Sequence, residues 1–116
     1  MPGTHIYNNP RCSKSRQALE LLNEHGVEAD VVEYLKTPPD ATTLSDILDM
    51  LGMEPRELMR SDEVEYRELG LDDASLTREQ LIVAMAEHPR LIQRPIVIHD
   101  GKAALGRPPQ QVLGIL

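Results

Sequence analysis

The sequence predicts a single α/β domain over residues 1–116, in which a mixed four-stranded sheet is interrupted by a helical insertion at about residues 40–90. Three observations predict this fold class. A strand-like run, a helix-like run and a second strand-like run succeed one another over residues 4–34, which is typical of a right-handed parallel β-α-β unit. Asp100-Gly101 separates two further strand-like runs, and this dipeptide is a strong hairpin signal. In the middle of the chain the apolar residues recur at helical spacing.

The β-α-β unit begins with a β-branched and aromatic run over residues 4–7, expected to be the first strand. Asn8-Asn9-Pro10 is turn chemistry and ends it. The helical pattern starts at Ser13 and stops at Gly26, a natural C-terminal cap. The second strand is expected over residues 30–34.

The insertion is expected to begin with a helix capped by Thr43 and closed by Gly52. Pro55 can occupy the first position of a short helix over residues 56–60, which would put Arg56 and Arg60 on one face at i, i+4.

Residues 61–76 are charged and broken by glycine, so only short helical turns are expected there. Thr77 and Gln80 form a capping box for the next helix, which must end by His88 because Pro89 follows.

The hairpin pairs residues 95–99 with residues 102–106, and its two-residue loop fixes the register so that Arg94 lies opposite Arg107. With strand order 2-1-3-4 and the third strand antiparallel to the first, both arginines lie at the sheet edge next to Cys12. Two arginines held side by side there suggest an anion clamp, although they can instead splay apart to separate carboxylates. Pro95 is predicted to follow a cis bond. Residues 109–116 are expected to form a closing helix or turn.

Cys12 is the only cysteine, and the pattern places it at or just before the first helical turn. Unpartnered amides and the helix dipole favour the thiolate there, and Arg11, Lys14 and Arg16 are nearby in sequence. Lowering the thiol pKa from about 8.5 to roughly 6 would leave it about 90 % ionised at pH 7. A lone cysteine can equally be an inert, buried, small hydrophobe.

The composition excludes several classes of function. A net charge of −7 argues against nucleic acid or an anionic membrane as the main partner. No apolar run is long enough for a membrane span, and the N-terminus does not have the pattern of a signal peptide. One cysteine fits a reducing cytoplasm. The scattered histidines show no metal-ligand spacing, so no metal or bound cofactor is expected. We expect a monomer.

Several motifs follow one another from about Thr4 to the C-terminus: residues 9–16 (NPRCSKSR), Tyr34-Leu35 with Thr37-Pro38-Pro39, residues 57–60 (ELMR), residues 94–97 (RPIV) and Gly106-Arg107-Pro108. Together they resemble the glutaredoxin-dependent arsenate reductase family (ArsC), in particular its short YfgD-like branch. That family has a thioredoxin-like fold, β-α-β, helical insertion, β-β-α.

The resemblance implies a cytoplasmic enzyme of arsenic detoxification. Cys12 would be the nucleophile that attacks arsenate, and Arg60, Arg94 and Arg107 match the family's oxyanion-binding arginines. Glutathione would be the reducing cosubstrate and would form a mixed disulfide with Cys12, which glutaredoxin would resolve. A single cysteine cannot close an internal disulfide, which is an independent reason to expect an external thiol.

Four further residues, Asn8, Ser13, Ser15 and Pro95, are expected to support the site. Asn8 departs from the family, which usually has a histidine at this position. A histidinium would help to lower the thiol pKa, whereas asparagine offers only a neutral hydrogen bond. The departure bears on the rate and on the identity of the substrate.

Two other functions remain open. An Spx-type regulator that binds RNA polymerase shares the fold, but such proteins use a CxxC switch where this chain has Ser15, and Gly52 fits a plain helix cap. A monothiol glutathione-linked reductase could act on another oxyanion or on protein mixed disulfides. A phosphatase-type arsenate reductase is excluded, since it needs an arginine at the position of Ala18.

Overall fold

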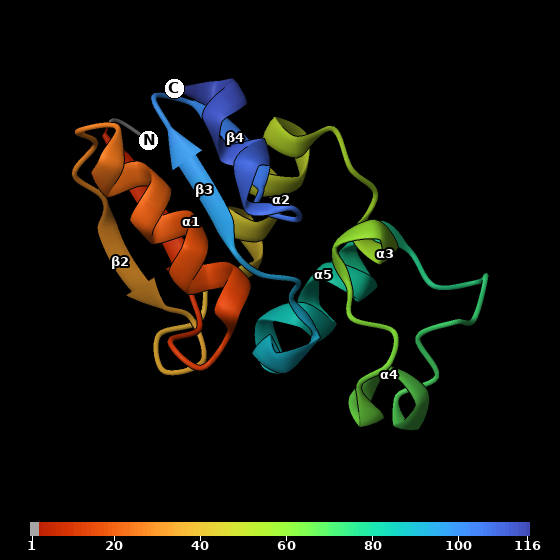
Figure 1. Ribbon diagram of the computed structural model, residues 1–116. Helices are drawn as coiled ribbons and strands as arrows, with labels where there is room; N and C mark the ends of the chain where they lie inside the picture. Colours follow the sequence, from red (N-terminus) through yellow and green to blue (C-terminus); the bar gives the residue numbers. More distant parts are fainter. Residues whose placement is uncertain (1–2) are drawn as a thin grey trace. The chain divides into compact units, whose positions relative to one another are not determined.

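The computed structural model describes residues 3–116 and divides the chain into two compact units (Figure 1). The sheet unit holds the chain up to Thr37 and from Arg94 to Leu116, and the helical unit holds Pro38–Gln93. The bounds of the helical unit are close to those expected for the insertion. The prediction that the chain forms one domain stays a prediction.

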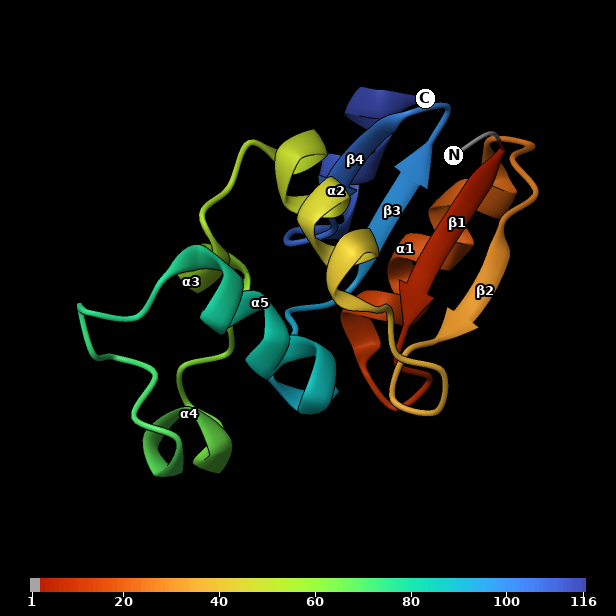
Figure 2. The ribbon, with the colours of Figure 1, turned by 180° about the vertical axis from the view of Figure 1, so that it is seen from behind.

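The sheet unit contains four strands in the order β2-β1-β3-β4, as the sequence predicts (Figure 2). Strand β1 pairs in parallel with β2 and antiparallel with β3, and β3 pairs antiparallel with β4. The hairpin register runs from His99 opposite Lys102 to Ile96 opposite Leu105, which confirms the expected two-residue loop. The strands are β1 (Thr4–Asn8), β2 (Asp30–Glu33), β3 (Ile96–His99) and β4 (Lys102–Leu105).

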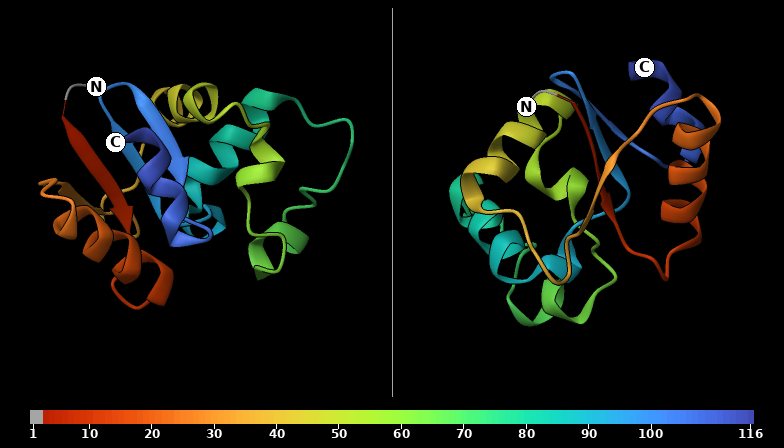
Figure 3. Two further views of the ribbon diagram at one scale, coloured as in Figure 1. Left: turned by 45° about the horizontal axis from the view of Figure 1, so that its top comes forward. Right: turned by 90° about the vertical axis from the view of Figure 1, so that its left-hand side faces the viewer.

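One face of this sheet is covered by α1 (Ser13–Glu24) and by the closing 3-10 helix η2 (Pro109–Ile115), which lie on the same side of the strands (Figure 3). The buried cluster between the helices and the sheet joins residues of β1, β3, α1 and η2: Ile6, Val97, Ala18, Leu22 and Val112. Since α1 buries positions 15, 18 and 22, its inner face follows the 3.6-residue period. The packing of this face fixes where the N-terminus of α1 lies relative to the end of β1.

The helical unit contains α2 (Ala41–Leu51), α3 (Pro55–Leu58), α4 (Val64–Glu68), α5 (Arg78–Glu87) and the 3-10 turn η1 (Pro89–Leu91). The capping box of Thr77 and Gln80 at the start of α5 is confirmed, and so is the end of that helix before His88. Helix α4 is a short helical segment of the kind expected in 61–76. Gly52 adopts a left-handed conformation (φ 66°) and caps α2, which favours the plain helix-cap interpretation.

The predicted cap at Thr43 is wrong. Helix α2 starts at Ala41, and its cap is Asp40, whose carboxylate accepts a 2.8 Å hydrogen bond from the backbone N–H of Thr43. Asp and Thr are both good capping residues, and here the one placed three residues before the donating amide takes the role.

The predicted helix over residues 56–60 is also wrong at its C-terminal end. Helix α3 stops at Leu58, and the chain then forms an antiparallel bridge between Met59 and Ile92. The backbone N–H of Arg60 donates to Leu91 O at 2.7 Å. Arg56 and Arg60 therefore do not share a helix face, because pairing with a distant segment competes with continuation of the helix.

Within residues 3–116, no helix combines the length and the apolar character needed to cross a membrane.

Candidate active site

Cys12 is the N-cap residue of α1, which confirms its predicted place between strand and helix. Its backbone is extended (φ −92°, ψ 123°), its N–H donates to Asn9 O at 2.9 Å, and its carbonyl accepts the first helical hydrogen bond from Arg16 at 3.1 Å. The turn after β1 thus delivers the sulfur to the end of the helix where the amides lack intrahelical partners.

The pKa of the Cys12 thiol is lowered from 9.0 to about 7. Partial burial of the sulfur is the largest influence and raises the pKa. It is outweighed by hydrogen bonds from the amide and hydroxyl of Ser15, by the amide of Lys14 and by the positive charge of Arg94. The burial explains why the pKa stays above the value of roughly 6 considered for a helix start with arginines. At pH 7 about half of the sulfur is thiolate.

Ser15 connects the site to the core. It is fully buried in the same face of α1 as Ala18 and Leu22, and its hydroxyl accepts a hydrogen bond from the backbone N–H of Asn9 at 3.3 Å. The hydroxyl is therefore oriented by the turn, which leaves its proton for the sulfur of Cys12. The sequence predicts Ser15 as a supporting residue but not its hydrogen bonds, because these depend on how the turn folds back over the helix.

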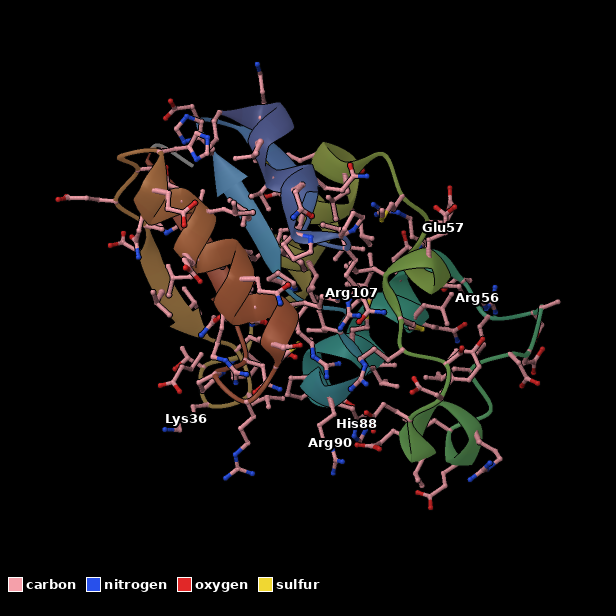
Figure 4. The ribbon with its side chains drawn as sticks, in the orientation of Figure 1. Lys36, Arg56, Glu57, His88, Arg90 and Arg107 are labelled. Atoms are coloured by element: carbon pink, nitrogen blue, oxygen red, sulfur yellow. The ribbon has the colours of Figure 1, made fainter. Side chains whose placement is uncertain are left out.

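Arg107 contacts the sulfur directly. Its Nη2 lies 3.8 Å from Cys12 Sγ, and its Nε donates a 2.7 Å hydrogen bond to the backbone carbonyl of Arg94. Arg107 is labelled in Figure 4. The carbonyl accepts from Nε while Nη2 faces the sulfur, so two contacts orient the guanidinium beside Cys12. Arg94 and Arg107 therefore lie next to each other, as predicted, and the contact between them joins the side chain of Arg107 to the backbone of Arg94.

Arg94 has a guanidinium with unused donors. Its Nε and Nη1 are shielded from solvent and have no hydrogen-bond partner among the described residues. Buried polar atoms of a native protein are nearly always paired, so unpaired ones are a signal for a site that takes an external group. Arg94 and Arg107 both precede cis prolines, and the cis bond predicted before Pro95 is present.

Gly106 allows the two arginine segments to approach each other. Its N–H donates to Pro95 O at 2.8 Å, and a Cβ at this position would lie 2.7 Å from Cγ of Pro95. No side chain larger than hydrogen fits there without movement of the proline ring. Gly106 was noted in the sequence only as part of the Gly106-Arg107-Pro108 motif. Its position opposite Pro95 in the hairpin register is the pattern from which its role could have been predicted.

The other predicted supporting residues differ in their surroundings. Asn8 ends β1 with a buried side chain whose Oδ1 has no partner among residues 3–116, whereas Ser13 is exposed at the first position of α1. Pro95 is buried immediately before β3. Their roles stay predictions.

Arg60 belongs to the helical unit, where it pairs with the carboxylates of Glu63 and Asp62. Its role beside Cys12 stays a prediction. In the described part of the chain, no group of three or more His, Cys, Asp or Glu residues is arranged to hold a metal ion.

The ArsC family model matches residues 7–115 of this chain. The chain belongs to the ArsC family. An arsenate reductase of Neisseria meningitidis is 50 % identical over the full length of both chains. A protein of Escherichia coli (strain K12) that bears the name YfgD is 60 % identical and covers 96 % of this chain and 94 % of its own.

The solved structure of an arsenate reductase from Vibrio cholerae superimposes with a TM-score of 0.96 at 48 % identity, covering 99 % of this chain and 98 % of that one. This similarity confirms the predicted thioredoxin-like α/β fold of this ArsC protein.

Proposed function

We propose that this ArsC protein is an arsenate reductase in which the Cys12 thiolate attacks arsenate. The observation that carries the proposal is the thiol with a pKa of about 7 at a helix N-terminus, 3.8 Å from Nη2 of Arg107 and under the charge of Arg94. A nucleophilic thiolate next to cationic donors is what attack on an anionic, tetrahedral oxyanion requires. Family membership and the names of the relatives support arsenate as the oxyanion.

The proposed reaction forms an S–As bond between Cys12 and arsenate, and one arsenate oxygen leaves as water after taking up protons. Glutathione thiolate then attacks the Cys12 sulfur, a disulfide between the two sulfurs forms, and the S–As electron pair stays on arsenic. Arsenic gains two electrons and passes from the +5 to the +3 state, while each sulfur loses one. Glutaredoxin then reduces the mixed disulfide by thiol–disulfide exchange and frees Cys12.

The arginines would act on charge. Arsenate carries one to two negative charges near neutrality, and guanidinium forks bind such oxygens with charge-assisted hydrogen bonds. The unpaired Nε and Nη1 of Arg94 are donors of this kind. Arg107 would stabilise the thiolate before attack and the displaced oxygen during it. We assign Arg60 to the same oxyanion because it ends the matching ELMR motif.

The external thiol follows from the cysteine count. Cys12 is the only cysteine of the sequence, so the second sulfur must come from another molecule. Glutathione and glutaredoxin are the thiols that the family resemblance implies, and both suit a cytoplasmic enzyme acting as a monomer.

The test follows NADPH oxidation in the presence of arsenate, glutathione, glutaredoxin and glutathione reductase. The wild-type protein is expected to give arsenate-dependent turnover, Cys12→Ser none, and Arg94→Ala only residual turnover. Omitting glutaredoxin should leave the protein as a mixed disulfide with glutathione, which mass spectrometry detects. If the wild type has no turnover while Cys12 still titrates near 7, the thiol serves another substrate, and protein mixed disulfides are the next to assay.

A further inference from the structure

Arg60 lies in a chain of ion pairs within the helical unit that the proposed reaction leaves unexplained. Nη1 of Arg60 donates a short hydrogen bond to Oε1 of Glu63. The other carboxylate oxygen of Glu63, Oε2, lies 3.6 Å from Nη2 of Arg90. Nε of Arg90 in turn lies 3.9 Å from Glu65. One carboxylate therefore holds two arginines, one on each oxygen.

The backbone brings these residues together. The bridge between Met59 and Ile92, with the hydrogen bond from Arg60 N–H to Leu91 O, places Arg60 beside the segment that carries Arg90. A turn closed by Glu63 N–H on Arg60 O at 3.1 Å returns Glu63 over the arginine. Arg90, labelled in Figure 4, comes from η1. The arrangement depends on main-chain hydrogen bonds, so it is not an accidental meeting of long side chains.

Burial separates this pair from ordinary surface ion pairs. The side chains of Arg60 and Glu63 are 21 % and 15 % exposed, whereas those of Arg90 and Asp62 are 68 % and 79 % exposed. Exposed ion pairs contribute little free energy to the folded state. A charge that is shielded from solvent depends on its partner, and the partner therefore fixes its position. Glu63 is thus the group that sets the orientation of Arg60.

The hydrogen-bond inventory leaves Arg60 able to bind more. A guanidinium has five N–H donors in one plane, and Glu63 takes one of them. Asp62, at 3.9 Å from Nη2, is beyond hydrogen-bond distance. One hydrogen bond to Glu63 therefore orients the guanidinium while other donors remain for an anion.

We propose that Glu63 is a positioning residue for the oxyanion, which orients Arg60 through one oxygen while Arg90 holds the other. This inference rests on the proposed function, in which Arg60 binds arsenate. The carboxylate of Glu63 has the same sign of charge as arsenate and repels it. It nevertheless increases the affinity for arsenate, because it fixes the orientation of Arg60. Pre-organised donors bind an anion more tightly than mobile ones because less side-chain freedom is lost on binding.

Kinetics of matched variants test the proposal. Glu63→Gln keeps the shape and one acceptor oxygen but loses the charge, and charge-assisted hydrogen bonds are roughly twice as strong as neutral ones. We expect the KM for arsenate to rise about fivefold with kcat changed less than about twofold. Arg90→Gln should raise KM about twofold. Glu65→Gln, which removes the charge that faces Arg90 and leaves the Arg60–Glu63 pair intact, is the matched control and should behave as wild type.

A double-mutant cycle separates positioning from general structure. In an Arg60→Ala background, Glu63→Gln should have no further effect on KM, because its action passes through Arg60. Equal effects of Glu63→Gln in both backgrounds would overturn the proposal. A lower KM in Glu63→Gln would also overturn it, since Glu63 would then compete with the anion for Arg60. Thermal unfolding of each variant shows whether the fold is kept, and the Arg90→Gln variant tests the same contact from its exposed side.

A binding readout distinguishes failure of this inference from failure of the proposed function. Arsenate should slow alkylation of Cys12 by iodoacetamide in the wild type, and about fivefold more arsenate should be needed in Glu63→Gln. Equal protection of both proteins overturns the role of Glu63 alone. A wild type that arsenate does not protect overturns both proposals.

Discussion

The arginines of the helical unit and those of the sheet unit have different kinds of partner. In the helical unit Arg78 donates to Ser45 and to Asp49 at 3.0 Å, and Arg60 and Arg90 share Glu63. Arg56 bonds two main-chain carbonyls, those of Leu71 and Asp73. All four guanidiniums have partners inside the unit, and those of Arg56 and Arg78 join segments of it that are distant in sequence.

The sheet unit treats its two site arginines in another way. Neither Arg94 nor Arg107 forms an ion pair with a carboxylate among residues 3–116, although the chain has 19 acidic residues against 12 basic ones. Arg107 donates one hydrogen bond to the backbone carbonyl of Arg94, and another of its N–H groups faces Cys12. Nε and Nη1 of Arg94 are buried and have no hydrogen-bond partner in the described part of the chain.

The difference identifies the place where the fold tolerates a loss of stability, namely the unpaired buried donors of Arg94. An unsatisfied buried donor costs about 1–3 kcal/mol, and more when it is charged, so a fold selected for stability alone would pair it. In an acidic chain a carboxylate would be an easy solution. Arginines kept free beside an activated thiol are expected of a site that awaits an external anion.

The largest effect is expected when an arginine is replaced by glutamine in the sheet unit and the result is compared with the same replacement in the helical unit. Arg94→Gln should lower kcat/KM for arsenate about 100-fold without lowering the melting temperature, because it removes the donors proposed to bind arsenate and breaks no hydrogen bond of the Arg94 Nε or Nη1. Arg78→Gln should lower the melting temperature by a few degrees, about 1 kcal/mol of stability, and leave kcat/KM nearly unchanged. Coupled kinetics and thermal unfolding of both variants measure this, and a loss of stability in Arg94→Gln equal to that in Arg78→Gln would break the comparison.

A smaller effect is expected where the sheet unit directs polar groups at the sulfur. Ser15→Ala removes the buried hydroxyl and should raise the pKa of Cys12 by about one unit, so that the thiolate at pH 7 falls from about half to about a tenth. Ultraviolet absorbance of the thiolate against pH measures this shift. Ser13→Ala is the control, since the Ser13 side chain is exposed and makes no hydrogen bond in the described chain. An equal shift in both variants would contradict a specific role of Ser15.

The smallest effect is expected from the spacing of the arginine segments. Gly106→Ala pushes a methyl group against Pro95 and should cost about 1–3 kcal/mol of stability and about threefold in kcat/KM, because Arg107 moves with its backbone. Gly114→Ala is the matched control, since a Cβ there meets nothing within 4 Å. Urea unfolding and coupled kinetics of the two variants decide the point. Identical stabilities would mean that the hairpin adjusts without strain.

Local patterns predicted the sheet unit well and the helical unit less well, for a physical reason. The Asp100-Gly101 turn, the period of α1 and the turn before Cys12 are encoded within a few residues. The path of Arg60 depends on a bridge to Ile92, more than thirty residues away, and no local pattern contains that partner. The cap at Asp40 was missed because two good capping residues compete three positions apart.

The site itself was predictable in its parts but not in its contacts. The lone cysteine at a helix start and the opposed arginines follow from motifs and hairpin register. The division of the Arg107 guanidinium between a carbonyl and the sulfur, and the free donors of Arg94, depend on side-chain packing that a sequence does not display.

The most direct test of the central claim is the rate of Cys12 alkylation by iodoacetamide as a function of pH, measured with and without arsenate. The thiolate is the reactive form, so the rate should rise with pH through a midpoint near 7, and arsenate should slow it at every pH in that range. A midpoint near 9, with no protection by arsenate, would mean that neither the activated thiol nor the anion site exists.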